Sequence, residues 1–146
     1  MQIFFPKEED HETRATILPE VAKKFTDLGI EVLIESGLGE KVFVSDELYV
    51  EAGATICNEK TKGLESADVV CKINKPNQDE IQSLRKNSIY ISFLDPFNER
   101  QIVSDLAAAD VSSISMELVP RITRAQKMDA LSSQANLAGY AAVIEA

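Results

Sequence analysis

Short runs of branched and aromatic residues alternate along the chain with segments of helical periodicity, and this alternation limits the possible folds most strongly. Strands are expected at Gln2–Phe5, Glu31–Glu35, Thr55–Cys57, Asp68–Ile73, Ser88–Phe93 and Ser113–Leu118. Several of them are apolar at consecutive positions, which is typical of strands covered on both faces. Strands that alternate with helices predict right-handed crossovers and a mainly parallel sheet.

Helices are expected at Pro19–Leu28, Asp46–Ala52, Gln78–Lys86, Glu99–Ala109 and from about Arg124 to the end of the chain. Pro19 suits the first turn of a helix. Asn77 with Glu80, and Thr123 with Gln126, have the spacing of capping boxes. The predicted fold class is therefore α/β: a doubly wound, mainly parallel sheet of the flavodoxin or Rossmann type, with a long C-terminal helix.

The composition of the chain excludes several classes of function. Fifteen Lys and Arg residues stand against 24 Asp and Glu residues, so the net charge is −9. Nucleic acids and acidic membranes need clustered positive charge, so neither partner is expected. No apolar run approaches the roughly 20 residues that span a bilayer, which predicts no direct membrane insertion. One histidine and two cysteines, without a C-x-x-C motif, predict no metal site and no disulfide framework.

Three motifs near the predicted strand ends have competing interpretations. Gly37-Leu38-Gly39 follows the second strand, but a dinucleotide fingerprint needs a third glycine where Val42 stands, so a plain turn is favoured. Arg14 lies in a charged loop after the first strand and can clamp a carboxylate or phosphate, or pair with a neighbouring acid such as Glu8. Lys72 and Asn74 are expected on one face of the fourth strand, where either can reach a ligand or simply face solvent.

A polar ridge in the last predicted helix is the strongest candidate site. Its members are spaced three or four residues apart, at Gln126, Asp129, Ser132 or Ser133, and Asn136. Arg121 precedes them, and such groups can hydrogen-bond a carboxamide such as that of nicotinamide. Alternatively, Gln126 only closes a capping box and Asp129 only favours the helix N-terminus. Ser132 has no adjacent base, so no nucleophilic catalyst is expected.

Several of these segments resemble the α-subunits of the proton-translocating NAD(P) transhydrogenase family. The matching motifs are PKE at 6–8, ETR at 12–14, ESGLG at 35–39, MELVPRITRAQ at 116–126 and DALSSQAN at 129–136. The last motif is highly specific, whereas the opening motifs are shared with the related alanine dehydrogenases. The resemblance extends over essentially all 146 residues.

The resemblance implies a role for four residues in cofactor binding. It places Arg121, Gln126, Asp129 and Ser132 around the nicotinamide ring of NAD(H), with Gln126 reaching toward the NADP(H)-bearing partner domain. The other three would orient the carboxamide and select the face of the ring that is presented. Hydride then passes directly between two nicotinamides, and the protein supplies distance and angle without a catalytic residue of its own.

The same resemblance implies that residues 1–146 are the N-terminal subdomain of a longer NAD(H)-binding domain. The apolar end of the chain, without a helix stop signal, also suggests a fragment. The expected partners are a downstream Rossmann subdomain, the NADP(H)-binding domain of a β subunit, and a second copy in a homodimer of the full protein. The expected location is cytoplasmic, peripheral to the inner membrane. NAD(H) should bind weakly or not at all to the fragment alone, and no metal is expected.

Two alternatives remain on the sequence alone. A diverged alanine dehydrogenase would use Arg14 for its substrate carboxylate, but by resemblance it needs a lysine at Asn74 and a catalytic histidine at Asp95. Asn74 fits the transhydrogenase pattern, whereas Asp95 departs from it, because an aromatic residue usually precedes that proline. The other alternative is a non-catalytic α/β module that binds a partner or a small ligand.

Overall fold

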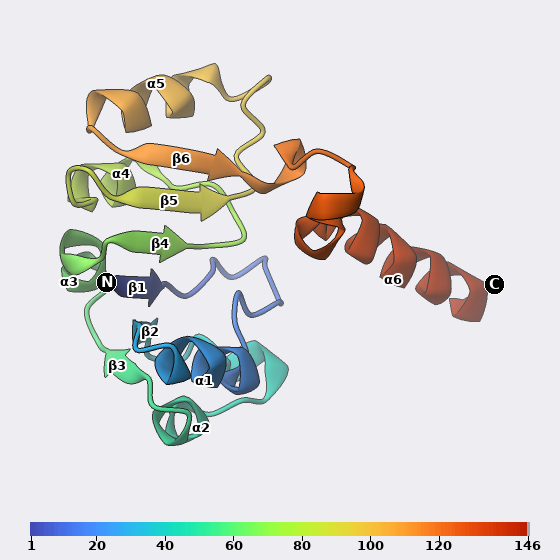
Figure 1. Cartoon of the computed structure of the whole chain (residues 1–146), viewed down its shortest axis with the longest axis horizontal. Coiled ribbons are helices and arrows are strands. Elements are labelled where there is room, and N and C mark those ends of the chain that lie inside the picture. Colours follow the sequence, from blue (N-terminus) through green and yellow to red (C-terminus); the bar gives the residue numbers. More distant parts are fainter. Residues whose placement is uncertain (146) are drawn as a thin grey trace.

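A six-stranded sheet forms the centre of the computed structural model, which describes residues 1–145. Its strands are β1 (Gln2–Phe5), β2 (Glu31–Glu35), β3 (Thr55–Cys57), β4 (Val69–Cys71), β5 (Ile89–Ser92) and β6 (Ser112–Ser115). All neighbouring strands are parallel, in the order β3-β2-β1-β4-β5-β6. This is the strand order of the dinucleotide-binding Rossmann fold, and it confirms the predicted fold class (Figure 1).

Helices cover both faces of the sheet and separate its core into two layers. They are α1 (Pro19–Asp27), α2 (Asp46–Glu51), α3 (Lys60–Ser66), α4 (Gln78–Ser83), α5 (Arg100–Ala108) and α6 (Ala130–Glu145). Ile3 and Phe5 of β1 pack in one core with residues of α1 and α2, whereas Phe4 packs in the other with residues of α3, α4 and α5. This division follows from the period of two along a strand.

Helix α3 was not predicted, and Gly63 explains both the omission and the packing. A glycine in the middle of a helix lowers its intrinsic propensity by about 1 kcal/mol relative to alanine. In the structure, however, a Cβ added to Gly63 would lie 2.5 Å from the ring of the buried Phe4. The glycine therefore lets α3 approach the sheet closely, and this tertiary requirement overrides the local propensity.

Two of the predicted helix boundaries are confirmed in detail. After α1, Gly29 has a φ of 77° and donates its N–H to the Thr26 carbonyl at 2.9 Å, while the N–H of Ile30 reaches the Phe25 carbonyl at 3.1 Å. This Schellman arrangement satisfies carbonyls that the helix leaves free. At the start of α4, Asn77 and Glu80 form the predicted reciprocal capping box.

The predictions for the last quarter of the chain were partly wrong. The sixth strand ends at Ser115, and Met116–Leu118 forms a 3-10 turn instead of continuing it. The expected single helix from Arg124 is divided into a 3-10 segment, Thr123–Met128, and α6, because Asp129 between them has a non-helical ψ of 83°. The expected capping box at Thr123 and Gln126 is absent, since Ile122 precedes the 3-10 segment and no side chain caps it.

Helix α6 projects away from the sheet, as Figure 1 shows, and none of its described residues is buried. Among residues 1–145, no helix is both long enough and apolar enough to cross a membrane.

Cys57 and Cys71 are free thiols and half-buried, and burial raises the pKa of Cys71 to about 12. A thiol with so high a pKa stays protonated and unreactive at neutral pH.

Two fully buried tyrosines differ in one respect that predicts opposite effects of removing their hydroxyl groups. Tyr49 donates to the Ile17 carbonyl at 2.7 Å, whereas the Tyr90 hydroxyl has no hydrogen-bond partner among residues 1–145. Tyr49→Phe should therefore lower the free energy of unfolding by about 1–1.5 kcal/mol, and Tyr90→Phe should leave it within about 0.5 kcal/mol or raise it. Urea unfolding of both variants tests this pair, and equal losses would contradict it.

Candidate functional site

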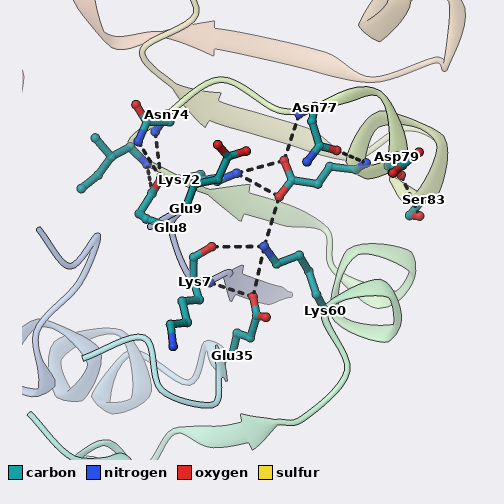
Figure 2. A network of polar contacts seen from close by, with 12 residues as sticks. Lys7, Glu8, Glu9, Glu35, Lys60, Lys72, Asn74, Asn77, Asp79 and Ser83 are labelled. Atoms are coloured by element: carbon teal, nitrogen blue, oxygen red, sulfur yellow. Dashed lines mark hydrogen bonds and ion pairs between the residues drawn. The ribbon is translucent and has the colours of Figure 1, made fainter. Parts of the chain in front are cut away.

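A chain of charged side chains joins the carboxyl ends of β1, β2 and β4 (Figure 2). The fully buried ammonium of Lys72 lies 2.9 and 3.0 Å from the two carboxylate oxygens of Glu80. Lys60 continues the chain, 3.3 Å from Glu80 and 3.6 Å from Glu35. Glu35 in turn accepts the backbone N–H of Lys7 at 2.8 Å. Every buried charge in this network therefore has an opposite charge beside it, as burial requires.

Glu80 has two structural tasks in this network. Burial by itself raises the pKa of its carboxyl, but hydrogen bonds and charge from Lys72, with help from the backbone N–H of Asn77 and the charge of Lys60, outweigh burial and lower that pKa. The same carboxylate closes the capping box at the start of α4. Lys72 is thus committed to an internal carboxylate, and its predicted access to a ligand is not seen.

Hydrogen bonds to the Glu8 carboxylate join the loop after β1 to the loop after β4. Its carboxylate accepts the backbone N–H groups of Ile73 and Asn74, the side-chain amide of Asn74 at 3.0 Å, and the hydroxyl of Thr16 at 3.1 Å. These two loops lie where the strand order reverses, which is the usual ligand crevice of such sheets. Here the protein's own carboxylate occupies that position.

Arg14 pairs with a neighbouring acid, but the acid is Glu12 and not the expected Glu8. Its Nε and Nη2 atoms lie 2.8 and 2.7 Å from the two Glu12 oxygens. Hydrogen bonds from Arg14 lower the pKa of Glu12 to about 2, against the opposing effect of burial. Asn74 also reaches Glu12, at 3.5 Å. The guanidinium donors that would bind a substrate carboxylate are therefore already paired with a carboxylate of the chain itself.

Gly37-Leu38-Gly39 forms a turn, as the missing third glycine predicted. Asp46 holds it by accepting the Gly37 N–H at 2.9 Å and the Ser36 hydroxyl at 2.7 Å. A 3-10 turn, Glu40–Val42, follows the motif. The acidic partner and the lack of an α-helix N-terminus directly after the glycines do not suit a phosphate.

The four residues singled out in the C-terminal segment line one hollow. It is open, has a volume of about 500 Å³ and is bounded by Arg121, Ile122, Thr123, Gln126, Asp129 and Ser132. Ligand pockets have volumes of about 300–1,000 Å³, so part of a dinucleotide fits. The structure therefore brings the four together, and their contact with nicotinamide remains a prediction. Ser133 and Asn136 do not line the hollow.

Asp129 is fixed in place by the helix that it precedes. Its carboxylate accepts the backbone N–H of Ser132 at 2.9 Å and the Ser132 hydroxyl at 2.6 Å. These hydrogen bonds, with the charge of Arg121, lower the pKa of the half-buried Asp129. The sequence alternative that Asp129 serves the helix N-terminus is thus correct, and the geometry leaves room for both tasks because a carboxylate accepts about four hydrogen bonds.

Sequence reasoning did not identify Glu8, Glu12, Lys60 or Glu80 as members of a polar network. Glu8 and Glu12 looked like parts of a solvated loop, yet each is less than a tenth exposed. The available signal was position, because both glutamates follow β1 at the edge where parallel strands end.

Asp95 is a turn residue with a φ of 51° and accepts two hydrogen bonds from the Asn98 amide.

Comparison with known proteins identifies the family. The model described as "Alanine dehydrogenase/PNT, N-terminal domain" matches residues 4–138. The chain belongs to this family. An NAD(P) transhydrogenase subunit alpha chain of Rhodospirillum rubrum is 41% identical over 151 residues, which cover 99% of this chain and 39% of that protein. The chain thus spans about two fifths of this relative.

Two solved structures, one of a transhydrogenase and one of an alanine dehydrogenase, resemble this chain to different degrees. The transhydrogenase of Sinorhizobium meliloti is 40% identical, with a TM-score of 0.94 over all of this chain and 44% of that one. An L-alanine dehydrogenase is 26% identical, with a TM-score of 0.77 over 82% of this chain and 33% of the other. The sequence resemblance to transhydrogenase α-subunits is therefore confirmed, and the alanine dehydrogenases are more distant.

The low pKa of Glu12 predicts a pH-dependent contribution to stability. Its carboxyl titrates near 2 in the folded protein and near 4.5 ordinarily, so the contribution is full above pH 4.5 and is lost as the pH falls toward 2. Because Arg14 is half-exposed, solvent screening limits the contribution to about 1–2 kcal/mol. Urea unfolding at pH 7, 5, 4 and 3 should show that Glu12→Gln destabilises the protein most at pH 7.

The matched control is Glu51→Gln, at an exposed glutamate with no side-chain hydrogen bond among residues 1–145. The control should change stability little at any of these pH values. A loss on Glu12→Gln that stayed constant from pH 7 to pH 3 would contradict the assigned charge pairing.

Proposed function

We propose that this chain is the N-terminal subdomain of the NAD(H)-binding component of a proton-translocating NAD(P) transhydrogenase. In the complete protein it would help to position NAD(H) for direct hydride transfer to or from NADP(H), coupled to proton translocation by membrane domains. The observation that carries this proposal is the shared hollow of Arg121, Gln126, Asp129 and Ser132. Similarity to transhydrogenase α subunits over the whole chain supports it.

The polar groups of the hollow fit a carboxamide. A carboxamide offers one carbonyl acceptor and an NH₂ donor pair, and the hollow presents a guanidinium and an amide as donors with a carboxylate and a hydroxyl as acceptors. When NAD(H) is bound, its nicotinamide supplies the hydride chemistry. Arg121 would hold the carbonyl side and Asp129 and Ser132 the NH₂ side, while Gln126 would reach toward the NADP(H)-bearing partner domain. Their contribution is orientation, which suits a site without a general base.

The remaining elements of the proposal concern what lies outside this chain. The Rossmann subdomain that would hold the rest of NAD(H), the NADP(H)-binding domain of a β subunit, and a second copy in a homodimer are the proposed partners. The proposed location is the cytoplasmic face of the inner membrane. Support comes from the 39% share of the Rhodospirillum subunit that this chain covers, which leaves room for further domains.

The internal contacts at Arg14 and Asn74 favour this proposal over amino-acid dehydrogenation. Both side chains hydrogen-bond to buried carboxylates of the chain itself. A 2-oxo acid would have to displace Glu12 from Arg14, and it would meet the negative charge of Glu8 beside Asn74. Asp95 offers no imidazole proton donor at the position where the alanine dehydrogenases need one.

A titration of the ¹⁵N-labelled chain with NADH, followed by amide shifts, tests the proposed nicotinamide site. We expect weak, saturable changes centred on residues 121–132, because only the nicotinamide end is contacted. Asp129→Asn keeps an acceptor for the Ser132 N–H but removes the charge, and should weaken binding about tenfold. Asp105→Asn is the control, since Asp105, on α5, is half-buried like Asp129 and also accepts side-chain hydrogen bonds. Shifts elsewhere, or equal affinities in both variants, would refute the site.

Pyruvate gives a separate test of the dehydrogenase alternative. Added to the same labelled chain, it should leave the side-chain signals of Arg14 and Asn74 unchanged, because Glu12 and Glu8 already occupy their donors. Acetate at equal concentration controls for ionic strength. Saturable shifts of both side chains with pyruvate and not with acetate would favour the dehydrogenase instead.

A further inference from the structure

Helix α6 carries the hollow at its first turn but has little packing to hold it in place. None of its described residues is buried, although several are large and apolar, including Leu137, Tyr140, Val143 and Ile144. Before α6, the 3-10 segment Thr123–Met128 is anchored by the buried Ala125 alone among its residues. Within residues 1–145, α6 meets the rest of the fold at the 3-10 turn Met116–Leu118 and at the loop after β1, so these contacts set its direction.

A single hydrogen bond joins α6 to the sheet domain in the part of the chain that the structure describes. Arg14 donates from Nη1 to Oε1 of Gln134 at 3.4 Å, across 120 positions of sequence. Gln134 lies on the second turn of α6, two residues after Ser132. Figure 1 shows the loop after β1, which contains Arg14, extending beyond the sheet on the side from which α6 departs.

Arg14 is well suited to this contact because its other donors are held firmly. The two short bonds to Glu12 fix the plane of the guanidinium. Glu12 is itself held by the Arg14 backbone N–H at 3.0 Å and by the amide of Asn74, and Lys41 binds its backbone carbonyl at 3.0 Å. The planar fork therefore points its remaining Nη1 group in a defined direction.

We infer that Arg14 is a positioning residue that sets the direction of α6 through Gln134, and with it the place of Asp129 and Ser132. In this chain the arginine thus acts on the helix, and not on a substrate carboxylate. The link runs from Asn74 at the end of β4 through Glu12 and Arg14 to α6. Naming the hollow as what is positioned rests on the proposed function, whereas the control of helix direction does not.

Residual dipolar couplings of the ¹⁵N-labelled 146-residue chain test the inference without any nucleotide. Backbone couplings of the sheet define an alignment, and those of α6 show whether the helix keeps one direction relative to it. In the unmodified chain both sets should fit one alignment. With Gln134→Leu the acceptor is lost, and the couplings of α6 should become smaller and no longer fit the alignment of the sheet. Arg14→Met should have the same effect.

Two further variants separate positioning from a general structural effect. Gln134→Glu retains an acceptor and adds charge attraction to Arg14, so it should keep the order of the unmodified chain. Asn136→Leu makes the same kind of polar-to-apolar change on α6, at a residue without a side-chain hydrogen bond among residues 1–145, and should leave the couplings unchanged. Urea unfolding of Gln134→Leu should match the unmodified chain, which excludes loss of the fold as the cause.

The inference is overturned if the couplings of α6 in Gln134→Leu fit the sheet alignment as well as those of the unmodified chain. It is also overturned if α6 fails to share the sheet alignment in the unmodified chain, or if Gln134→Glu loses order to the same extent as Gln134→Leu. Because no nucleotide is present, these outcomes are independent of the NADH titration. Failure of the nicotinamide site and failure of the Arg14 contact can therefore be told apart.

Discussion

The carboxylate of Glu8 satisfies backbone N–H groups at the point where β1 and β4 separate, and much of the structure depends on it. Parallel strands diverge at the switch point, so the N–H groups of Ile73 and Asn74 lose their ladder partners there. An acid from the neighbouring loop replaces them. Once that carboxylate is buried, every further group nearby has to be polar and paired, which accounts for Asn74, Glu12 and Arg14. The crevice is thereby closed by the chain itself.

This closure bears on whether the crevice of the sheet can bind a small carboxylate. An arginine and a polar residue at the ends of β1 and β4 suit a small carboxylate only if their donors are free. Here those donors are taken, and the polar groups that line an open hollow lie instead on the segment that follows β6. The candidate site therefore lies at the start of a helix and not at the crevice of the sheet. A site of that kind can orient a ligand, and its carboxylate, whose pKa is lowered, is a weaker base than an ordinary aspartate.

The sequence was sufficient for the sheet and insufficient for the contacts between its ends. Buried strands such as Glu31–Glu35 carry a local signal, because their branched residues have no other stable environment. Helix α3 carries none, since Gly63 is required by Phe4, a residue far away in sequence. The partner of Glu8 is equally non-local, since Asn74 lies 66 positions away. Family resemblance, and not residue chemistry alone, singled out Arg121, Gln126, Asp129 and Ser132, and the structure adds that they line one hollow.

The double use of Asp129 sets a physical condition on the proposed site. Its hydrogen bonds to Ser132 keep it ionised and fix its direction relative to α6, but only relative to α6. Orientation of a ligand requires precision of about 0.5 Å with respect to the rest of the site. A helix without buried residues does not provide that precision by itself. The cap at Asp129 and the contact between Arg14 and Gln134 are therefore complementary: the first fixes the acceptor on the helix, and the second fixes the helix on the sheet domain.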